Sequence, residues 1–244
     1  MASSFADDEL FKEPPPREEC PICMLTLPIH TTEQRYQPCC GKILCTGCIY
    51  AAFQADNRRL CPFCRIPEAN SEGEALLRIK KRAEANDAVA IHQLGGFYCI
   101  GENSIPQDYN KAIELWLRAG ELGCAAAYDC VADMYDDWRE KEAKHYYELA
   151  AMAGWVRARH NLGSVEARAG NMERAMKHLM ISAGAGFDDS LKGIRVLFMN
   201  GHATKDDFEN ALRAHKAAKD QMKSAQRDAA AARRVQQHFA SPMD

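Results

Sequence analysis

Eight of the 11 cysteines in this chain lie between Cys20 and Cys64, and their spacing is that of metal ligands. They form three Cys-x-x-Cys pairs and one adjacent pair: CPIC at 20–23, Cys39-Cys40, CTGC at 45–48 and CPFC at 61–64. Thiolates bind zinc strongly because the ion is borderline-soft and takes four ligands in a tetrahedron. Eight sulfurs are enough for two closed sites, and closed zinc sites are structural. We therefore predict two Zn²⁺ ions and a segment 20–65 that is unfolded without them.

The rest of the composition agrees with metal binding rather than disulfides. Residues 1–19 have no apolar core behind a basic flank, so no secretory signal is expected, and no run of 18 apolar residues predicts a membrane span. We expect a cytoplasmic or nuclear protein whose thiols stay reduced. The net charge of −3 argues against a protein that mainly grips nucleic-acid phosphates.

Residues 20–65 resemble the RING finger family. In that family the first and third ligand pairs share one ion, which implies Cys20, Cys23, Cys45 and Cys48 at one site. The second and fourth pairs share the other, which implies Cys39, Cys40, Cys61 and Cys64. Lys42 stands where a histidine is usual, so the resemblance is to all-cysteine variants, although those usually separate the second pair by one residue. His30 is the alternative for the fourth ligand of this second site. A PHD finger is rejected because Arg59 occupies the place of its tryptophan.

The resemblance implies a ubiquitin-protein ligase that forms no covalent intermediate and works by positioning a ubiquitin-conjugating enzyme charged with ubiquitin. Ile22 and Pro62 would form an apolar groove for that enzyme, with Phe53 on the following helix as a further contact. Arg65, after the last cysteine, would be the catalytic linchpin that bridges the conjugating enzyme and ubiquitin. The alternative is a scaffold whose zinc module only mediates protein contacts.

Residues 86–220 carry an internal repeat of about four units. Gly123, Gly154 and Gly186 are 31 and 32 residues apart, and a large apolar residue follows eight positions after each: Val131, Leu162 and Ile194. Pairs of small residues spaced by seven recur with nearly the same period: Ala112 and Ala119, Ala143 and Ala150, Ala175 and Ser182, Ala211 and Ala218. Since one helical pair cannot bury its apolar face alone, we predict an all-α solenoid of stacked helix pairs.

These units resemble Sel-one-like repeats, relatives of the tetratricopeptide repeats. The resemblance implies a protein-binding scaffold that captures an unknown substrate on its concave face. Outside the two domains, we expect a disordered acidic tail over residues 1–19 and a linker with a connecting helix over 66–85. Residues 221–244 are expected to form a C-terminal helix and tail, with the helix giving the last repeat its polar outer face.

Overall fold

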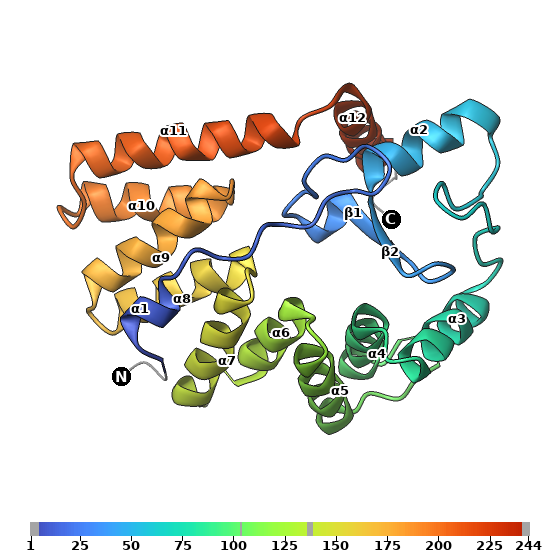
Figure 1. Ribbon diagram of the computed structural model, residues 1–244, viewed down its shortest axis with the longest axis horizontal. Helices are drawn as coiled ribbons and strands as arrows, with labels where there is room; N and C mark the ends of the chain where they lie inside the picture. Colours follow the sequence, from blue (N-terminus) through green and yellow to red (C-terminus); the bar gives the residue numbers. More distant parts are fainter. Residues whose placement is uncertain (1–4, 103, 136–138, 241–244) are drawn as a thin grey trace.

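The structure is a computed structural model that describes residues 5–102, 104–135 and 139–240. Its helices form an arc that runs from α3 to α11, and the cysteine-rich segment lies between the two ends of that arc (Figure 1). The architecture is therefore a helical solenoid that curves around a small N-terminal module.

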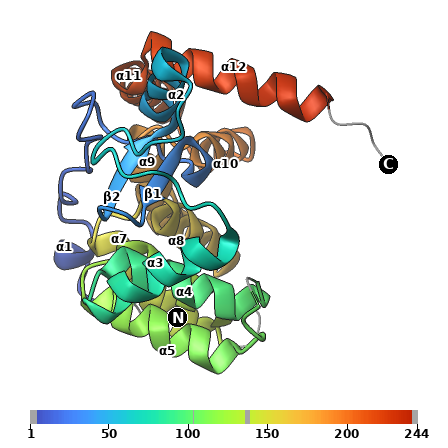
Figure 2. The same ribbon diagram turned by 90° about the vertical axis from the view of Figure 1, so that its right-hand side faces the viewer.

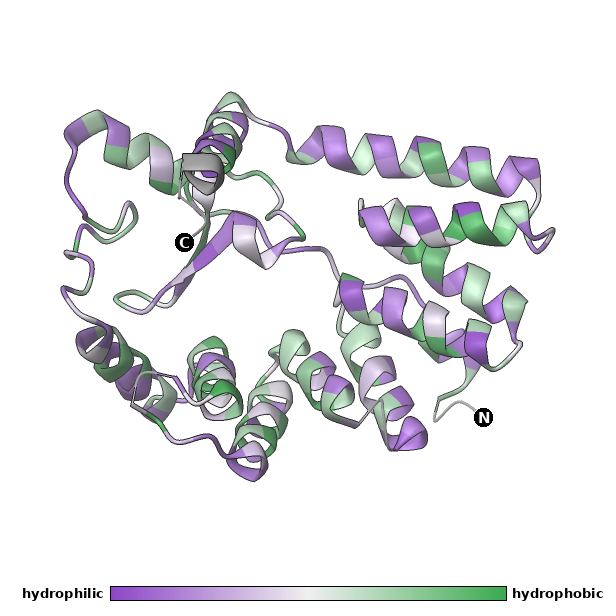
Figure 3. Cartoon of the chain, turned by 180° about the vertical axis from the view of Figure 1, so that it is seen from behind, coloured by the Kyte–Doolittle hydropathy of each residue, from purple (hydrophilic) through white to green (hydrophobic). Residues whose placement is uncertain are grey.

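Four helix pairs build the solenoid, each packed against the next along the chain. They are α4 (Ala88–Ile100) with α5 (Tyr109–Glu121), α6 (Ala125–Tyr135) with α7 (Glu140–Met152), α8 (Val156–Arg168) with α9 (Met172–Gly184), and α10 (Asp188–Met199) with α11 (Lys205–Met222). Four pairs over this range are what the repeat predicts. In Figure 3 the apolar residues recur along each helix in patches, as one-sided burial requires.

The repeat residues form the core between the pairs. Val131, Leu162 and Ile194 are fully buried, as are seven of the eight small residues of the spaced pairs: Ala112, Ala119, Ala143, Ala150, Ala175, Ser182 and Ala211. The eighth, Ala218, is only half-buried. The first three units each end at a glycine with left-handed backbone, at φ of +97°, +88° and +97° for Gly123, Gly154 and Gly186. Residues with a side chain disfavour that conformation, so each of these turns requires a glycine, and the glycines recur with the period of the repeat.

The N-terminal module contains a two-stranded sheet and one helix. Strand β1 (Gln34–Gln37) follows a 3₁₀ turn (η1, Thr31–Glu33) and pairs antiparallel with β2 (Lys42–Cys45), and α2 (Thr46–Asp56) follows directly. The module is joined to the solenoid through α3 (Glu72–Glu84), whose first turn is capped by the Ser71 hydroxyl, which accepts from the Glu74 amide at 3.2 Å. The predicted connecting helix is thus present.

The expected disorder of the N-terminal tail is wrong for residues 5–19, while residues 1–4 lie outside the described residues. The tail contains a single turn, α1 (Asp7–Leu10), and crosses α7, α8 and α9 on its way to the module (Figure 1). Leu10 is fully buried. The tail has too few apolar residues to fold alone, but the repeats supply the surface that it lacks.

The C-terminal helix also differs from its predicted role. Helix α12 (Ala225–Ala240) does not cover the last repeat but turns away from α11 and packs against α2 of the module (Figures 1 and 2). The far end of the solenoid is closed by α11 itself, whose only buried residue among those described is Ala211. Residues 5–19 therefore pack on the repeats, and α12 packs on the module.

Candidate metal centre

The eight cysteines meet in two groups of four, and within each group the sulfur atoms lie within 4.8 Å of one another. One group is Cys20, Cys23, Cys45 and Cys48; the other is Cys39, Cys40, Cys61 and Cys64. This is the interleaved grouping that the RING resemblance implies, and both adjacent cysteines belong to the second group. Each Cys-x-x-Cys pair thus shares a group with a pair that is distant in the sequence.

The sulfur separations fit a tetrahedral ion. The Sγ atoms of Cys20 and Cys48 are 3.9 Å apart, those of Cys40 and Cys61 are 3.8 Å apart, and those of Cys39 and Cys64 are 3.4 Å apart. Zinc–sulfur bonds of about 2.3 Å in a tetrahedron require sulfurs about 3.8 Å apart, whereas a disulfide requires about 2.05 Å. The donor set and its spacing therefore fit a metal ion and exclude cysteine pairing.

Two of the pairs lie on loops with the same backbone hydrogen bonds. The amide after the second cysteine donates to the carbonyl of the first, Met24 to Cys20 at 2.8 Å and Arg65 to Cys61 at 2.9 Å. Met24 and Arg65 are left-handed, with φ of +56° and +64°. These bonds fold each Cys-x-x-Cys back on itself, so that both sulfurs point to one side. We call residues 20–25 and 61–66 the first and second knuckle.

The protonation of the thiols depends on a cation. Burial and hydrogen bonding with Cys45 raise the pKa of the Cys48 thiol, and burial with the neighbouring sulfurs raises that of Cys39. At Cys20 the effect of burial is outweighed by amide donors, which lower the pKa to about 7. Four packed thiols resist ionising together, and a bound divalent ion reverses this by stabilising all four thiolates.

Arg227 of α12 contacts the first cysteine group and the backbone next to it. Its guanidinium donates to the carbonyls of Thr26 at 2.8 Å and Leu25 at 3.3 Å, and to Cys23 Sγ at 3.6 Å. Gly47 makes this approach possible, because a Cβ there would lie 2.7 Å from the Arg227 backbone nitrogen. Sequence reasoning assigned α12 to the solenoid and so missed this residue, since no local pattern links residues about 200 positions apart.

The predicted docking residues have different surroundings. Ile22 is 41% exposed, Pro62 is half-buried, and the neighbouring Phe63, which the sequence reasoning did not single out, is 44% exposed. Phe53 is half-buried, and its ring lies 5.7 Å from the Arg233 guanidinium of α12. The structure therefore leaves apolar surface on both knuckles but engages Phe53 within the chain.

Arg65 is held by the end of α2. Its Nη2 donates to Asp56 Oδ2 at 3.1 Å, and the same carboxylate accepts from Arg58 at 3.1 Å. The Arg65 side chain is 55% exposed. The arginine is consequently oriented by a neighbour and still open to a partner.

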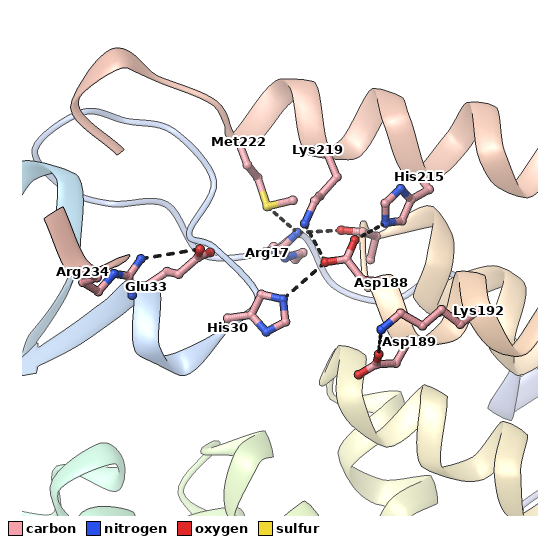
Figure 4. A network of polar contacts seen from close by, with 11 residues as sticks. Arg17, His30, Glu33, Asp188, Asp189, Lys192, His215, Lys219, Met222 and Arg234 are labelled. Carbon is pink, nitrogen blue, oxygen red and sulfur yellow. Dashed lines mark hydrogen bonds and ion pairs between the residues drawn. The ribbon is translucent and has the colours of Figure 1, made fainter. Parts of the chain in front are cut away.

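His30 is not near the second cysteine group, so it does not supply the alternative fourth ligand. Its Nε2 lies 3.6 Å from Asp188 Oδ2 at the start of α10. Asp188 also accepts from His215 and Lys219 of α11, each at 2.9 Å (Figure 4). His30 therefore joins the module to the last repeat.

A cavity of about 880 Å³ separates the module from the inner helices of the arc. Its wall includes Tyr36 and Ile43 of the module and His92, Asp129 and Arg157 of the repeats. Asp129 is fully buried and bonded to the Trp155 indole at 2.7 Å. Burial raises the Asp129 pKa to about 6 against the opposing effect of Arg157. These contacts make Asp129 part of the packing between repeats.

Comparison with known proteins supports the helical body. A family model, Sel1 repeat, matches residues 88–124 and 140–155. A solved Sel1 repeat protein from Oxalobacter formigenes is 27% identical, with a TM-score of 0.53, and the alignment covers 61% of this chain and 64% of that one. The helical body therefore contains Sel1 repeats, and its solenoid fold is similar to that of this solved protein. The family match does not include the cysteine-rich module.

Further solved structures are similar at lower levels. A protective antigen of uropathogenic Escherichia coli with an SLR fold is 18% identical with a TM-score of 0.49, covering 66% of this chain and 40% of that one. The immunity protein Pa5087 from Pseudomonas aeruginosa is 15% identical with a TM-score of 0.45, covering 72% and 66%. No curated protein matches the sequence. Among the described residues, no helix combines the length and apolar character needed to span a bilayer.

Proposed function

We propose that the chain is a RING-type ubiquitin-protein ligase of the cytoplasm or nucleus, whose module binds two zinc ions and whose Sel1 repeats recruit a protein substrate. The observation that carries the proposal is the interleaving of the two cysteine groups, which holds both knuckles in one small module. Zinc supplies structural cross-links here and no open coordination position for catalysis.

The exposed apolar residues support docking of a conjugating enzyme. Ile22 and Phe63, one on each knuckle, are 41% and 44% exposed, and a docked partner would cover them. Ala52 of α2, where the resemblance implies a bulky groove residue, lies about 160° around the helix from Tyr50. Ala52 is half-buried and lacks that bulk, and α12 packs on the side of Tyr50 through Arg233.

Arg65 would bias the flexible conjugate toward a reactive arrangement. Its guanidinium has five donors, and Asp56 uses only part of that capacity. The remaining donors are free to bridge the conjugating enzyme and ubiquitin. Positioning of this kind lowers the barrier without a covalent step.

The test is discharge of ubiquitin from charged conjugating enzymes to free lysine, with the zinc-loaded full chain. We expect Ile22→Ala and Arg65→Ala to slow discharge by about tenfold or more, which corresponds to about 1.4 kcal/mol of transition-state stabilisation. Arg59→Ala is the matched control, because Arg59 is exposed and makes no side-chain bond among the described residues. Equal discharge by wild type and Arg65→Ala would remove the linchpin role.

The second candidate is a scaffold without transfer activity, and the contact of the half-buried Phe53 with Arg233 favours it. If no conjugating enzyme responds to the wild-type chain while two zinc ions remain bound, the module serves only protein contacts. The repeats' role in binding protein is common to both candidates.

A further inference from the structure

Residues 5–17 lie on the repeats in the manner of a bound peptide. Phe5 stacks on His145 of α7 with ring centroids 5.8 Å apart, and Pro15 packs against Gly154 after α7. Arg17 ends the segment by donating to the Ala185 carbonyl after α9 at 3.1 Å. The segment thus contacts two successive repeats in extended form, interrupted only by the single turn of α1.

The centre of the contact is Leu10-Phe11. Leu10 is fully buried, and its carbonyl accepts from Arg159 Nη2 of α8 at 2.7 Å. The Phe11 ring lies 4.6 Å from the ring of His178, which is itself fully buried. Three cations of α8 and α9 surround Phe11, with Arg159, Arg174 and Lys177 at 6.0, 5.5 and 5.8 Å from its centroid.

Charge adds selectivity to this apolar contact. Asp7 pairs with Arg174, whose Nε is oriented by the buried Glu166 at 3.1 Å. Asp8 and Glu9 extend the acidic run ahead of Leu10. The surface therefore matches an acidic stretch followed by Leu-Phe, and we call Arg159, Arg174, Lys177 and His178 the tail site.

The tail is an incomplete ligand for this site. Three buried nitrogen atoms have no hydrogen-bond partner among the described residues: Arg159 Nε, Arg174 Nη2 and His178 Nε2. Burial and the Arg159 charge lower the His178 pKa to about 3, so the ring is neutral, and with Nδ1 facing Arg159 its Nε2 carries the hydrogen. Buried donors without an acceptor are destabilising. A one-turn helix without a side-chain cap adds little order of its own.

We propose that the tail site is the repeats' binding site for a partner segment with acidic residues followed by Leu-Phe, and that residues 5–11 are an internal ligand which such a partner displaces. The unpaired donors give an incoming acidic peptide contacts that the tail does not make. Peptide binding at the tail site does not depend on transfer activity by the module.

The test uses a fluorescent peptide of residues 2–16 and the full chain, read by anisotropy. The probe is compared on wild type and on a full chain with Asp7→Lys and Phe11→Ala, which loosen the internal tail. We expect the loosened chain to bind the probe at least tenfold more tightly, because its own tail no longer competes. A circular dichroism melt of both full-length chains checks that the repeats stay folded.

Peptide variants make the test independent of folding. Asp7→Lys and Phe11→Ala in the peptide should each weaken binding to the loosened chain by at least fivefold. Asp8→Lys is the matched control, since Asp8 is exposed and makes no side-chain bond among the described residues. The proposal is overturned if the loosened chain does not bind the probe, or if the Asp7→Lys and Asp8→Lys peptides bind equally. A wild-type dimer that exchanges tails, seen by light scattering, would also overturn the internal placement.

Discussion

His30 of the module and Asp188 of the last repeat lie 3.6 Å apart, although they are 158 positions apart in the sequence. The Asp188 carboxylate gathers His30, His215 and Lys219, so it joins the module, α10 and α11 at one point (Figure 4). Asp188 thereby links the module to the last repeat.

Asp188→Asn should loosen this closure. We expect a loss of about 1 kcal/mol in the free energy of unfolding, modest because the carboxylate is 41% exposed. Hydrogen exchange around residues 28–33 should rise in the variant. Asp189→Asn is the control, because Asp189 pairs with Lys192 on its own helix and with no other cation among the described residues, and it should change neither quantity.

The same contact has a defined pH dependence. Burial acts to raise the Asp188 pKa, but the bond from Lys219 and the nearby cations lower it overall. A carboxyl with a lowered folded-state pKa stabilises above its unfolded value of about 3.9 and loses that effect as the pH falls through the folded value. The difference in stability between wild type and Asp188→Asn should therefore be full at pH 7 and shrink as the pH falls below the unfolded value of about 3.9. A difference that does not shrink on acidification would contradict this account.

Metal content tests the two cysteine groups directly. Native mass spectrometry of the wild-type chain should find two zinc ions, and Cys40→Ser should retain only the ion of the first group. Cys99→Ser, outside both groups, should retain two. A chelator should unfold residues 20–65 while the helical signal of the repeats stays, because each ion contributes about 10 kcal/mol to folding.

Arg227 should govern how firmly the first ion is held. Arg227→Ala removes the bonds to Thr26, Leu25 and Cys23, and groups behind metal ligands typically contribute 10- to 100-fold in affinity. We expect one of the two ions to leave about tenfold faster in a chelator competition. Arg233→Ala, which loses only ring contacts with Tyr50 and Phe53, should release zinc at the wild-type rate.

The predictable parts of this protein are those with a local or periodic signal. Cysteine spacing predicts the ligands, and the glycines with their following apolar residues predict the four helix pairs. The tail was missed because Leu10 and Phe11 are too few to indicate a core, and their burial depends on Arg159 and His178 of distant helices. The role of Arg227 was missed because it depends on the position of α12 in the folded chain. Helix α12 reaches the module at Gly47, where the absence of a side chain leaves room for the Arg227 backbone.

Glu166 gives the repeats a stability test that is separate from the module. It is fully buried, and it accepts from Lys144 at 2.8 Å, Arg174 at 3.1 Å and Asn171 at 2.8 Å. Glu166→Ala should lower the free energy of unfolding by about 3 kcal/mol, since removing one partner of a buried pair leaves the other charge uncompensated. Glu173→Ala, which removes an exposed partner of Lys177, should leave the free energy of unfolding unchanged.

The pH dependence of the free energy of unfolding at acid pH tests the role of Glu166. Burial acts to raise its pKa, but the bonds from Lys144, Asn171 and Arg174 lower it to about 2. Its contribution is therefore complete above the unfolded value of about 4.3 and is lost as the pH falls toward 2. Urea titrations of wild type and Glu166→Ala should converge over that interval. Because Arg174 also pairs with Asp7, the variant should in addition expose residues 5–11 to faster proteolysis, and an unchanged cleavage rate would disconnect Glu166 from the tail site.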